Sequence, residues 1–119
     1  MNVKFSSIAD RGDVSKERVV LKVLAETDVG HFAVLRTGRR DNMATTGVKD
    51  IFWFPDKAVK AGDLVVLYTK SGVQSEKTLD NGSKAHFFYW GQSAPLWGTN
   101  DVVGVVLYSS DWNTFLPEK

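Results

Sequence analysis

Short apolar runs separated by polar turns give this chain the pattern of an all-β protein. The run LVVLYT at residues 64–69 is apolar at nearly every position, which is typical of a strand covered on both faces. The segment VVLKVLAE at 19–26 fits a strand or a helix by spacing, but its three valines favour a strand. Residues 27–30 then form a turn into HFAVLR, so we expect these two runs to pair as a hairpin.

The other predicted strands lie in aromatic and valine-rich segments. DIFWFP is a short strand that Pro55 ends or places at a sheet edge, and AHFFYW resumes strand character after a polar, flexible connection over 70–84. VVGVVLY at 102–108 forms the last strand, in which Gly104 is expected to mark a bulge. RTGRRDNMATTG at 36–47 has no period and is predicted to be a loop. Many short strands without a long amphipathic helix predict an all-β sandwich or barrel.

Composition narrows the class of protein further. A chain of 119 residues fits one domain, and fifteen basic against fourteen acidic residues give a net charge of +1, without the domain-wide positive field of many nucleic-acid binders. There is no cysteine, so neither disulfides nor thiolate chemistry are available. The first 18 residues lack the apolar core of a secretory signal, and no run approaches a membrane span of roughly 20 residues. We therefore expect a cytoplasmic protein with no membrane partner.

Two stretches together resemble the lamin-tail domain: FWFPDKAVKAGDLVVLYTKSG at 52–72 and FYWGQSAPLWGTNDVVGVVLYSSD at 88–111. In that family a Phe-Pro element is followed by a Gly turn, a strand of the V-x-L-Y type, a Trp-bearing segment, and an Asn/Gly/Asp turn before the final hydrophobic strand. The same order is present here. The matching positions are Phe54 and Pro55 at the corner, Gly62 at the turn, Val65 to Tyr68 in the strand, Trp97, the Asn100-Asp101 turn, and Val102 to Leu107.

This resemblance implies a fold and a class of function. Residues 18–112 would form an immunoglobulin-like antiparallel β-sandwich, with 1–17 as an N-terminal extension or first strand and 113–119 as a C-terminal tail. The lamin-tail family has no common enzymatic activity. Its members mostly act as interaction modules in lamins and in multidomain bacterial surface or nuclease proteins, so the resemblance implies a non-catalytic module.

The aromatic segment HFFYWGQSAPLW at 86–97 has two interpretations. As a strand it directs Phe87 and Tyr89 to one face of the sheet and Phe88 and Trp90 to the other. In one interpretation loops cover both pairs, and Trp97 plugs the end of the sandwich. In the other, some of these rings stay exposed and anchor a protein partner or a second copy. The residues predicted for partner binding are Trp53, Tyr89, Trp90 and Trp97.

Three arginines, Arg36, Arg39 and Arg40, lie close together in the predicted loop. Guanidinium groups can bind phosphates or carboxylates in a bidentate manner, so these residues form a candidate anion-binding site. The alternative is a solvated loop in which Asp41 is a partial partner. Because so few phosphate contacts give weak binding at physiological salt, nucleic-acid binding is expected to be weak.

Catalytic and metal-binding motifs are not evident. His31 and His86 are the only histidines, and neither lies in a sequence cluster of metal ligands. No Gly-x-Ser-x-Gly elbow or phosphate-binding Gly-x-x-x-x-Gly-Lys motif is present. The sequence therefore predicts no enzyme, no metal and no cofactor. It predicts a non-catalytic module that recognises a protein partner through aromatic side chains, or alternatively a subunit that associates with itself.

Overall fold

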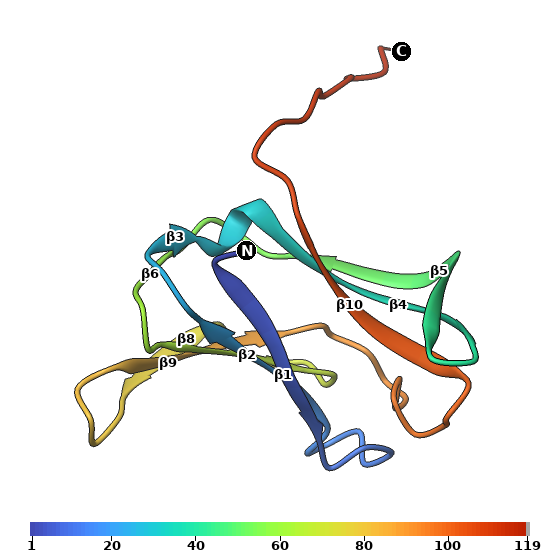
Figure 1. The fold of residues 1–119 in the computed structure, drawn as a ribbon, viewed down its shortest axis with the longest axis horizontal. Coiled ribbons are helices and arrows are strands. Elements are labelled where there is room, and N and C mark those ends of the chain that lie inside the picture. The colour runs from blue at the N-terminus through green and yellow to red at the C-terminus, as the bar shows by residue number, and fades with distance from the viewer. Residues whose placement is uncertain (119) are drawn as a thin grey trace.

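The computed structural model describes residues 1–118 as two β-sheets and a short two-stranded ribbon (Figure 1). The larger sheet contains, in spatial order, β1 (Val3–Ala9), β2 (Arg18–Val23), β7 (Leu64–Tyr68), β9 (Lys84–Tyr89) and β8 (Ser75–Thr78). The smaller sheet contains β10 (Val102–Tyr108), β4 (Phe32–Arg40) and β5 (Met43–Trp53). The ribbon pairs β3 (Thr27–Asp28) with β6 (Ala58–Val59), and a 3-10 turn, η1 (Val29–His31), leads into β4.

The hydrophobic core lies between the two sheets. Alternate residues of β2 and β7 point inward from the large sheet, and Phe32 and Val34 of β4 meet them from the small sheet, all essentially without solvent exposure. Phe88 of β9 is buried among them. The predicted all-β sandwich is therefore confirmed. Within residues 1–118, no helix is long and apolar enough to span a membrane.

One strand pair departs from the antiparallel rule. β7 and β9 run parallel, with Leu64 opposite Ala85 and Tyr68 opposite Tyr89. Parallel neighbours need a connection that returns the chain to the other end of the sheet. The segment 70–84 provides that return, and it contains β8, which pairs antiparallel with β9 at the sheet edge. The connection predicted to be flexible is therefore partly a strand.

Two predicted connections are wrong. The runs at 19–26 and 31–36 do not form a hairpin, because β2 pairs with β1 and β7 whereas β4 pairs with β10 and β5. Each run has an apolar inward face, and these faces meet across the core. The predicted loop at 36–47 is a hairpin between β4 and β5, turning at Asp41 with φ of 54°. Two irregularities in the β4–β5 register hide the alternation that marks a regular strand.

Gly104 does not mark a bulge, since the β10–β4 register is continuous from Val102 to Tyr108. Its role is to leave space for an aromatic ring. A Cβ atom at this position would lie 2.6 Å from Cζ of Phe5 in β1 and 3.4 Å from Cη2 of Trp97. Glycine thus allows β1 and β10, from opposite sheets, to approach each other at the side of the sandwich.

A buried carboxylate fixes the long connection between β9 and β10. Glu17 is fully buried, and its side chain accepts hydrogen bonds from the backbone amides of Gly12 at 2.9 Å, Leu96 at 2.9 Å and Trp97 at 3.1 Å, and from the Thr69 hydroxyl. Burial by itself raises the pKa of Glu17, but the four hydrogen bonds outweigh this effect and leave the pKa below its usual value. The charged carboxylate therefore holds Trp97 in the core.

The N- and C-terminal segments differ in their packing. Residues 3–9, which the sequence left as an extension or a first strand, form β1 and pair with β2. Residues 109–118 have no regular secondary structure, and Figure 1 shows this segment projecting away from both sheets. We call residues 109–118 the C-terminal arm. The predicted tail at 113–119 falls within it, except that Lys119 lies outside the described residues.

Candidate functional site

The four aromatic residues predicted for partner binding occupy three different places. Trp97 is 1% exposed, so its ring is in the core and is not available to a partner. Trp90 is partly buried between the sheets, where its ring centroid lies 5.9 Å from that of Phe52 and 6.3 Å from that of Trp97. Tyr89 lies on the side of the large sheet that points away from the core, and Trp53 lies on the corresponding side of the small sheet. The structure therefore does not bring these four rings into one surface.

The ring of Tyr89 is partly covered on the outer face of the large sheet. It stacks on Tyr68 with a centroid distance of 5.4 Å and an interplanar angle of 11°. Lys70 Nζ lies 5.0 Å from the Tyr68 ring, and Gly72 approaches Tyr89 so closely that a Cβ would be 2.4 Å from its Cδ1 atom. The segment after β7 thus folds over this aromatic group and partly covers the Tyr89 ring.

The small sheet is different, because its outward side is almost entirely apolar and four of its large side chains are exposed. Alternation places two rows of side chains on this side, opposite the core-facing Phe52 and Val106, and a third row follows after the register shift between Arg36 and Thr37. We call this surface the outer face. Its rows, read across β5, β4 and β10, are Trp53, Ala33 and Leu107; Ile51, Leu35 and Val105; and Val48, Thr37 and Val103. None of these nine side chains carries a charge.

The exposed fractions of the flanking side chains are large. They are 49% for Val48, 56% for Ile51, 55% for Trp53 and 48% for Leu107. Single exposed apolar residues are common on soluble proteins, but a contiguous group of them marks an interaction surface. Sequence reasoning identified only Trp53 of this group. The signal was present in VVGVVLY, which is apolar at both alternating sets of positions and therefore predicts apolar side chains on both sides of the strand.

Trp53 is held rigidly at one end of the outer face. Its indole Nε1 donates a 2.7 Å hydrogen bond to the carbonyl oxygen of Gly30. Trp112 of the C-terminal arm packs edge-on against it, with a centroid distance of 4.9 Å and an interplanar angle of 88°. These two rings, with Ile51 and Leu107, line an apolar pocket of about 160 Å³. A rigid aromatic anchor beside a small pocket is the arrangement found at the energetic centre of protein interfaces.

The three predicted anion-binding arginines are not equivalent. Arg36 points toward the interior, where Nε donates to the Leu96 carbonyl at 2.6 Å and Nη1 pairs with Asp50 at 2.8 Å. Arg39, at the end of the β4–β5 hairpin, donates to the backbone carbonyl of Asn100 at 3.0 Å. Arg40 is exposed. Only Arg39 and Arg40 therefore present charge at the surface, and Arg36 is part of the fold.

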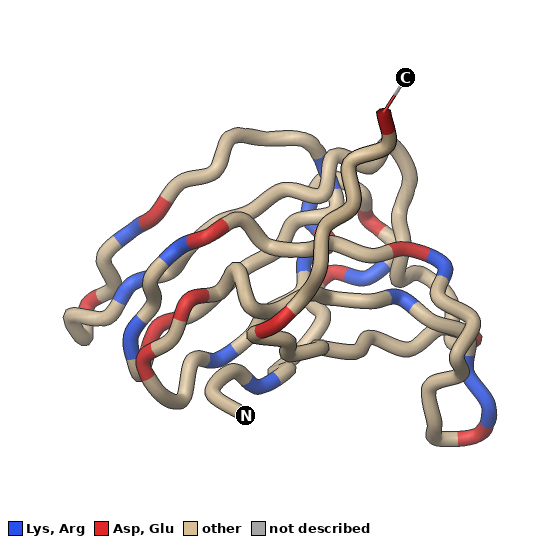
Figure 2. Tube along the Cα trace, turned by 90° about the horizontal axis from the view of Figure 1, so that it is seen from above, with Lys and Arg blue, Asp and Glu red and all other residues tan. Residues whose placement is uncertain are grey.

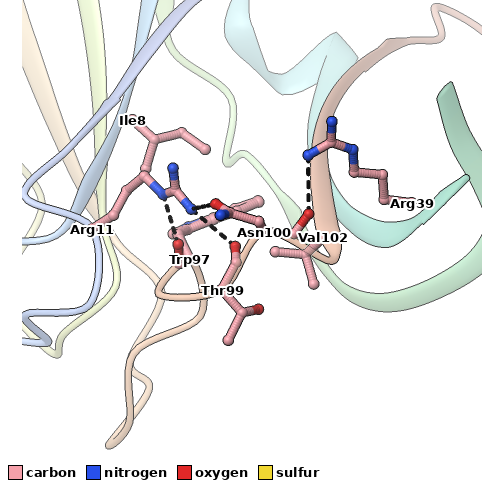
Figure 3. A pocket seen from close by; sticks show the side chains of 7 residues that line it. All are labelled: Ile8, Arg11, Arg39, Trp97, Thr99, Asn100 and Val102. Atoms are coloured by element: carbon pink, nitrogen blue, oxygen red, sulfur yellow. Dashed lines mark hydrogen bonds between the residues drawn. The ribbon is translucent and has the colours of Figure 1, made fainter. Parts of the chain in front are cut away.

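Sequence reasoning did not identify Arg11, which lies across from Arg39. Arg11 donates from Nε to the Trp97 carbonyl at 2.8 Å and from Nη2 to the Thr99 carbonyl at 2.9 Å. Figure 3 shows Arg11 and Arg39 on opposite sides of the segment that leads into β10, where they line a pocket of about 300 Å³. Because both guanidinium groups already donate to backbone carbonyls, their first role is to hold this segment in place.

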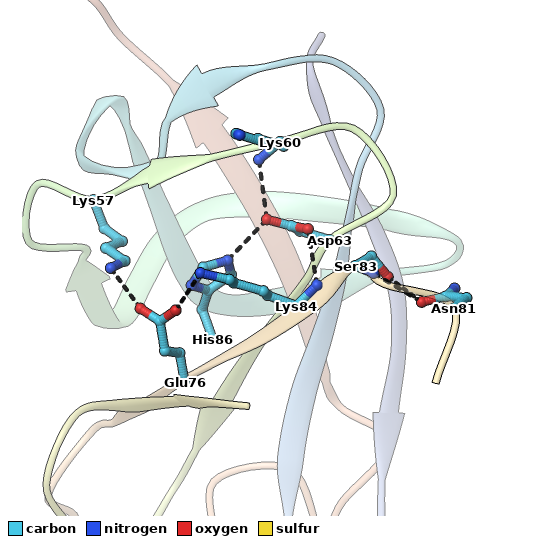
Figure 4. A network of polar contacts seen from close by, with 8 residues as sticks. All are labelled: Lys57, Lys60, Asp63, Glu76, Asn81, Ser83, Lys84 and His86. Atoms are coloured by element: carbon cyan, nitrogen blue, oxygen red, sulfur yellow. Dashed lines mark hydrogen bonds and ion pairs between the residues drawn. The ribbon is translucent and has the colours of Figure 1, made fainter. Parts of the chain in front are cut away.

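His86 forms the one histidine–carboxylate pair within residues 1–118. Its Nε2 donates to Asp63 at 2.9 Å, and both side chains are almost fully buried. Asp63 also accepts from the backbone amides of Lys60 and Lys84, each at 3.0 Å, as Figure 4 shows. Burial raises the pKa of Asp63, but the hydrogen bonds lower this pKa by a larger amount, so it lies below its usual value. The carboxylate therefore joins the β6–β7 turn to the start of β9.

Within residues 1–118, no serine or threonine hydroxyl is hydrogen-bonded to His86. Ser83, on the turn before β9, donates instead to Asn81 at 2.6 Å. Glu76 accepts from Lys57 at 2.7 Å and pairs with Lys84 at 2.8 Å, and these two ammonium groups lower the pKa of Glu76 to about 2. In the part of the chain that the structure describes, no three His, Asp or Glu side chains are arranged to hold a metal ion.

Charges of both signs are interspersed over the molecule, as Figure 2 shows. No family model matches the chain, and a search of curated proteins finds no significant relative. The resemblance to the lamin-tail domain thus stays a prediction. The outer face, with Trp53 as its anchor, is the site that the geometry itself distinguishes from the remaining surface.

Proposed function

We propose that this protein is a non-catalytic binding module that recognises a protein partner through the outer face of its small sheet. The observation that carries the proposal is the uncovered, uncharged surface around Trp53, Ile51 and Leu107. Water removed from apolar surface provides about 25 cal/mol per Å², and a rigid sheet loses little conformational freedom when it binds. The outer face is thus suited to a partner with an apolar surface of its own.

The hydrogen bond from Trp53 to Gly30 supports this role. A tryptophan that is already fixed in the free protein loses less side-chain entropy on binding than a mobile one. Tryptophan is also among the residues that contribute most to binding at protein interfaces. Trp53 is therefore the proposed main anchor, with Ile51 and Leu107 as the apolar surface around it.

Site-specific cross-linking tests the proposal. A photoreactive phenylalanine derivative replaces Ile51 in one sample and Leu24 in another. The two side chains have nearly equal exposure, 56% and 55%, but Leu24 comes directly after β2 of the large sheet and so lies outside the outer face. We expect position 51, but not position 24, to form a specific cross-link in native lysate.

The cross-linked protein is then identified, purified and measured against Ile51→Lys and Leu24→Lys. Ile51→Lys should weaken direct binding about tenfold or more, and Leu24→Lys should leave it unchanged. Circular dichroism of both variants checks that the fold is retained. Equal cross-linking at both positions, or equal binding by both variants, would refute the outer face as the binding surface.

Nucleic-acid binding has weaker support. Arg36 pairs with Asp50 and points toward the core, so the positive charge of this candidate site comes from Arg11, Arg39 and Arg40. So few phosphate contacts give low affinity at physiological salt. Arg40→Glu tests this alternative without disturbing the fold, and a strong loss of affinity for single- or double-stranded DNA at low salt would support it.

A further inference from the structure

The C-terminal arm exposes apolar side chains beyond its contact with the outer face. Trp112 lies against Trp53, but Phe115 is 85% exposed and Leu116 is 79% exposed. Figure 1 shows the arm leaving the body of the molecule after β10. In this arrangement neither of these two adjacent apolar side chains packs on the sheets of its own chain.

The outer face by itself is too small for a stable protein interface. Three strands about 4.8 Å apart, over the six residues from Val48 to Trp53 at about 3.3 Å each, give a footprint of roughly 300 Å². A typical stable interface buries about 800 Å² on each partner. A partner that covers only the sheet therefore falls well short, and additional surface has to come from beside it. The arm lies at that position.

We propose that the occupant of the outer face is a second copy of this chain, and that the two copies exchange their C-terminal arms. In this arrangement Phe115 and Leu116 of each copy pack on the outer face of the other. The inference rests on the proposed function, because it assigns a partner to the same surface. A two-fold interface uses one patch twice, so the patch has to be compatible with itself.

The outer face meets that condition. Its nine side chains are uncharged, so placing two such faces together brings no like charges into contact. The direction of the arm also favours exchange. Trp112 already lies against Trp53 at the end of its own outer face, whereas Phe115 and Leu116 stay exposed, and Figure 1 shows the C-terminal arm projecting away from the sheets. In this arrangement the exposed part of the arm is available to a second copy.

Molecular mass measured over a concentration series tests the inference. We expect light scattering and sedimentation to show a wild-type dimer. The double variant Phe115→Asp/Leu116→Asp should raise the dimer dissociation constant about tenfold or more, because charges placed in an apolar contact oppose association. Val73→Asp is the matched control, since Val73 is also 85% exposed but lies in the segment before β8. This control should dimerise like the wild type.

Isotope-labelled and unlabelled copies, mixed and cross-linked through a photoreactive residue at position 51, should join position 51 of one copy to residues 112–118 of the other. A wild-type protein that is monomeric at every concentration would overturn the exchange. A dimer unaffected by the double arm variant would overturn it as well. Neither result contradicts the proposed function. The proposed function is contradicted by a different result, namely that position 51 cross-links to no protein at all.

Discussion

The ring of Trp97 is the largest side chain buried in the core, and it lies where the connection between β9 and β10 closes one end of the sandwich. Trp97→Ala removes this ring and leaves a cavity beside Phe5 and Trp90. We expect the free energy of unfolding to fall by about 3–5 kcal/mol, measured by urea denaturation. Trp112→Ala, at a half-exposed position, should cost about 1 kcal/mol or less. Equal losses in the two variants would contradict the assignment.

The stability of the fold also depends on the single residue Glu17. Glu17→Gln places an NH₂ group among backbone amides and a hydroxyl that all donate, so at least one buried donor loses its acceptor. We expect a loss of about 2–4 kcal/mol in the free energy of unfolding. Glu26→Gln, at an exposed position, is the control and should change the stability by less than about 0.5 kcal/mol. A Glu17→Gln protein as stable as the control would contradict the role of the carboxylate.

These two residues also show what sequence can reveal at this scale. A tryptophan next to a turn is a natural candidate for a core plug, because large aromatic side chains dominate core packing. Glu17 carried no such signal. Its partners include the amides of Leu96 and Trp97, 79 and 80 residues away, and backbone amides have no identity in a sequence. A glutamate in a polar segment is expected to be solvated, and only the fold reveals its hydrogen bonds.

At the scale of strands, Gly104 determines how closely β1 and β10 approach. Gly104→Ala places a Cβ within 2.6 Å of the Phe5 ring, so the ring or the strand has to shift. We expect a loss of about 1–3 kcal/mol in the free energy of unfolding. In a double-mutant cycle, Phe5→Leu should remove part of this cost, because the shorter side chain leaves space for the new methyl group. Strict additivity of the two changes would contradict a direct contact.

Strand positions were predicted better than strand partners. The strands at 64–68, 84–89 and 102–108 lie where the apolar runs predicted them, because an alternating or continuous apolar run reflects local geometry. Pairing depends on which apolar faces meet, and β2 and β4 meet across the core although the turn between them resembles a hairpin turn. The β4–β5 hairpin was missed because its threonines, glycines and arginines resemble a loop and its register is interrupted.

For the candidate site, sequence predicted aromatic anchors and the structure selects among them. Trp53 is exposed on the outer face, whereas Trp97 is buried and Tyr89 is partly covered. The selection depends on strand register, since a shift of one residue would turn Trp53 into the core and Phe52 outward. Neighbours such as Leu107 join Trp53 only through β4, and no local pattern shows that these two strands lie in one sheet.

The whole molecule should lose stability in acid. The pKa values of Glu17 and Asp63 are lower in the folded protein than the ordinary values of 4.5 and 3.8, so their contribution is complete above those values. It is lost as the pH falls through the lower folded pKa values, because protonation then favours the unfolded chain. We expect the free energy of unfolding to be nearly constant above pH about 5 and to fall below pH about 4.5.

Urea denaturation over this pH range measures the effect. Glu17→Gln should be less stable at neutral pH and should show a shallower decline in acid, because one of the two groups no longer titrates. Glu26→Gln should keep the full decline. Parallel curves for wild type and Glu17→Gln would show that the acid sensitivity originates from other groups.

The place of β10 in the small sheet has a consequence for synthesis of the protein. Phe32 pairs with Tyr108, so the edge of β4 that pairs with β10 has no neighbouring strand until almost the whole chain has been translated. During that interval β4 and β5 form a two-stranded hairpin that exposes Phe32 and Val34 as well as an unpaired strand edge, and such intermediates are prone to aggregate. The last strand to leave the ribosome is therefore the one that protects the first half of the chain, and premature termination before residue 102 should yield insoluble protein.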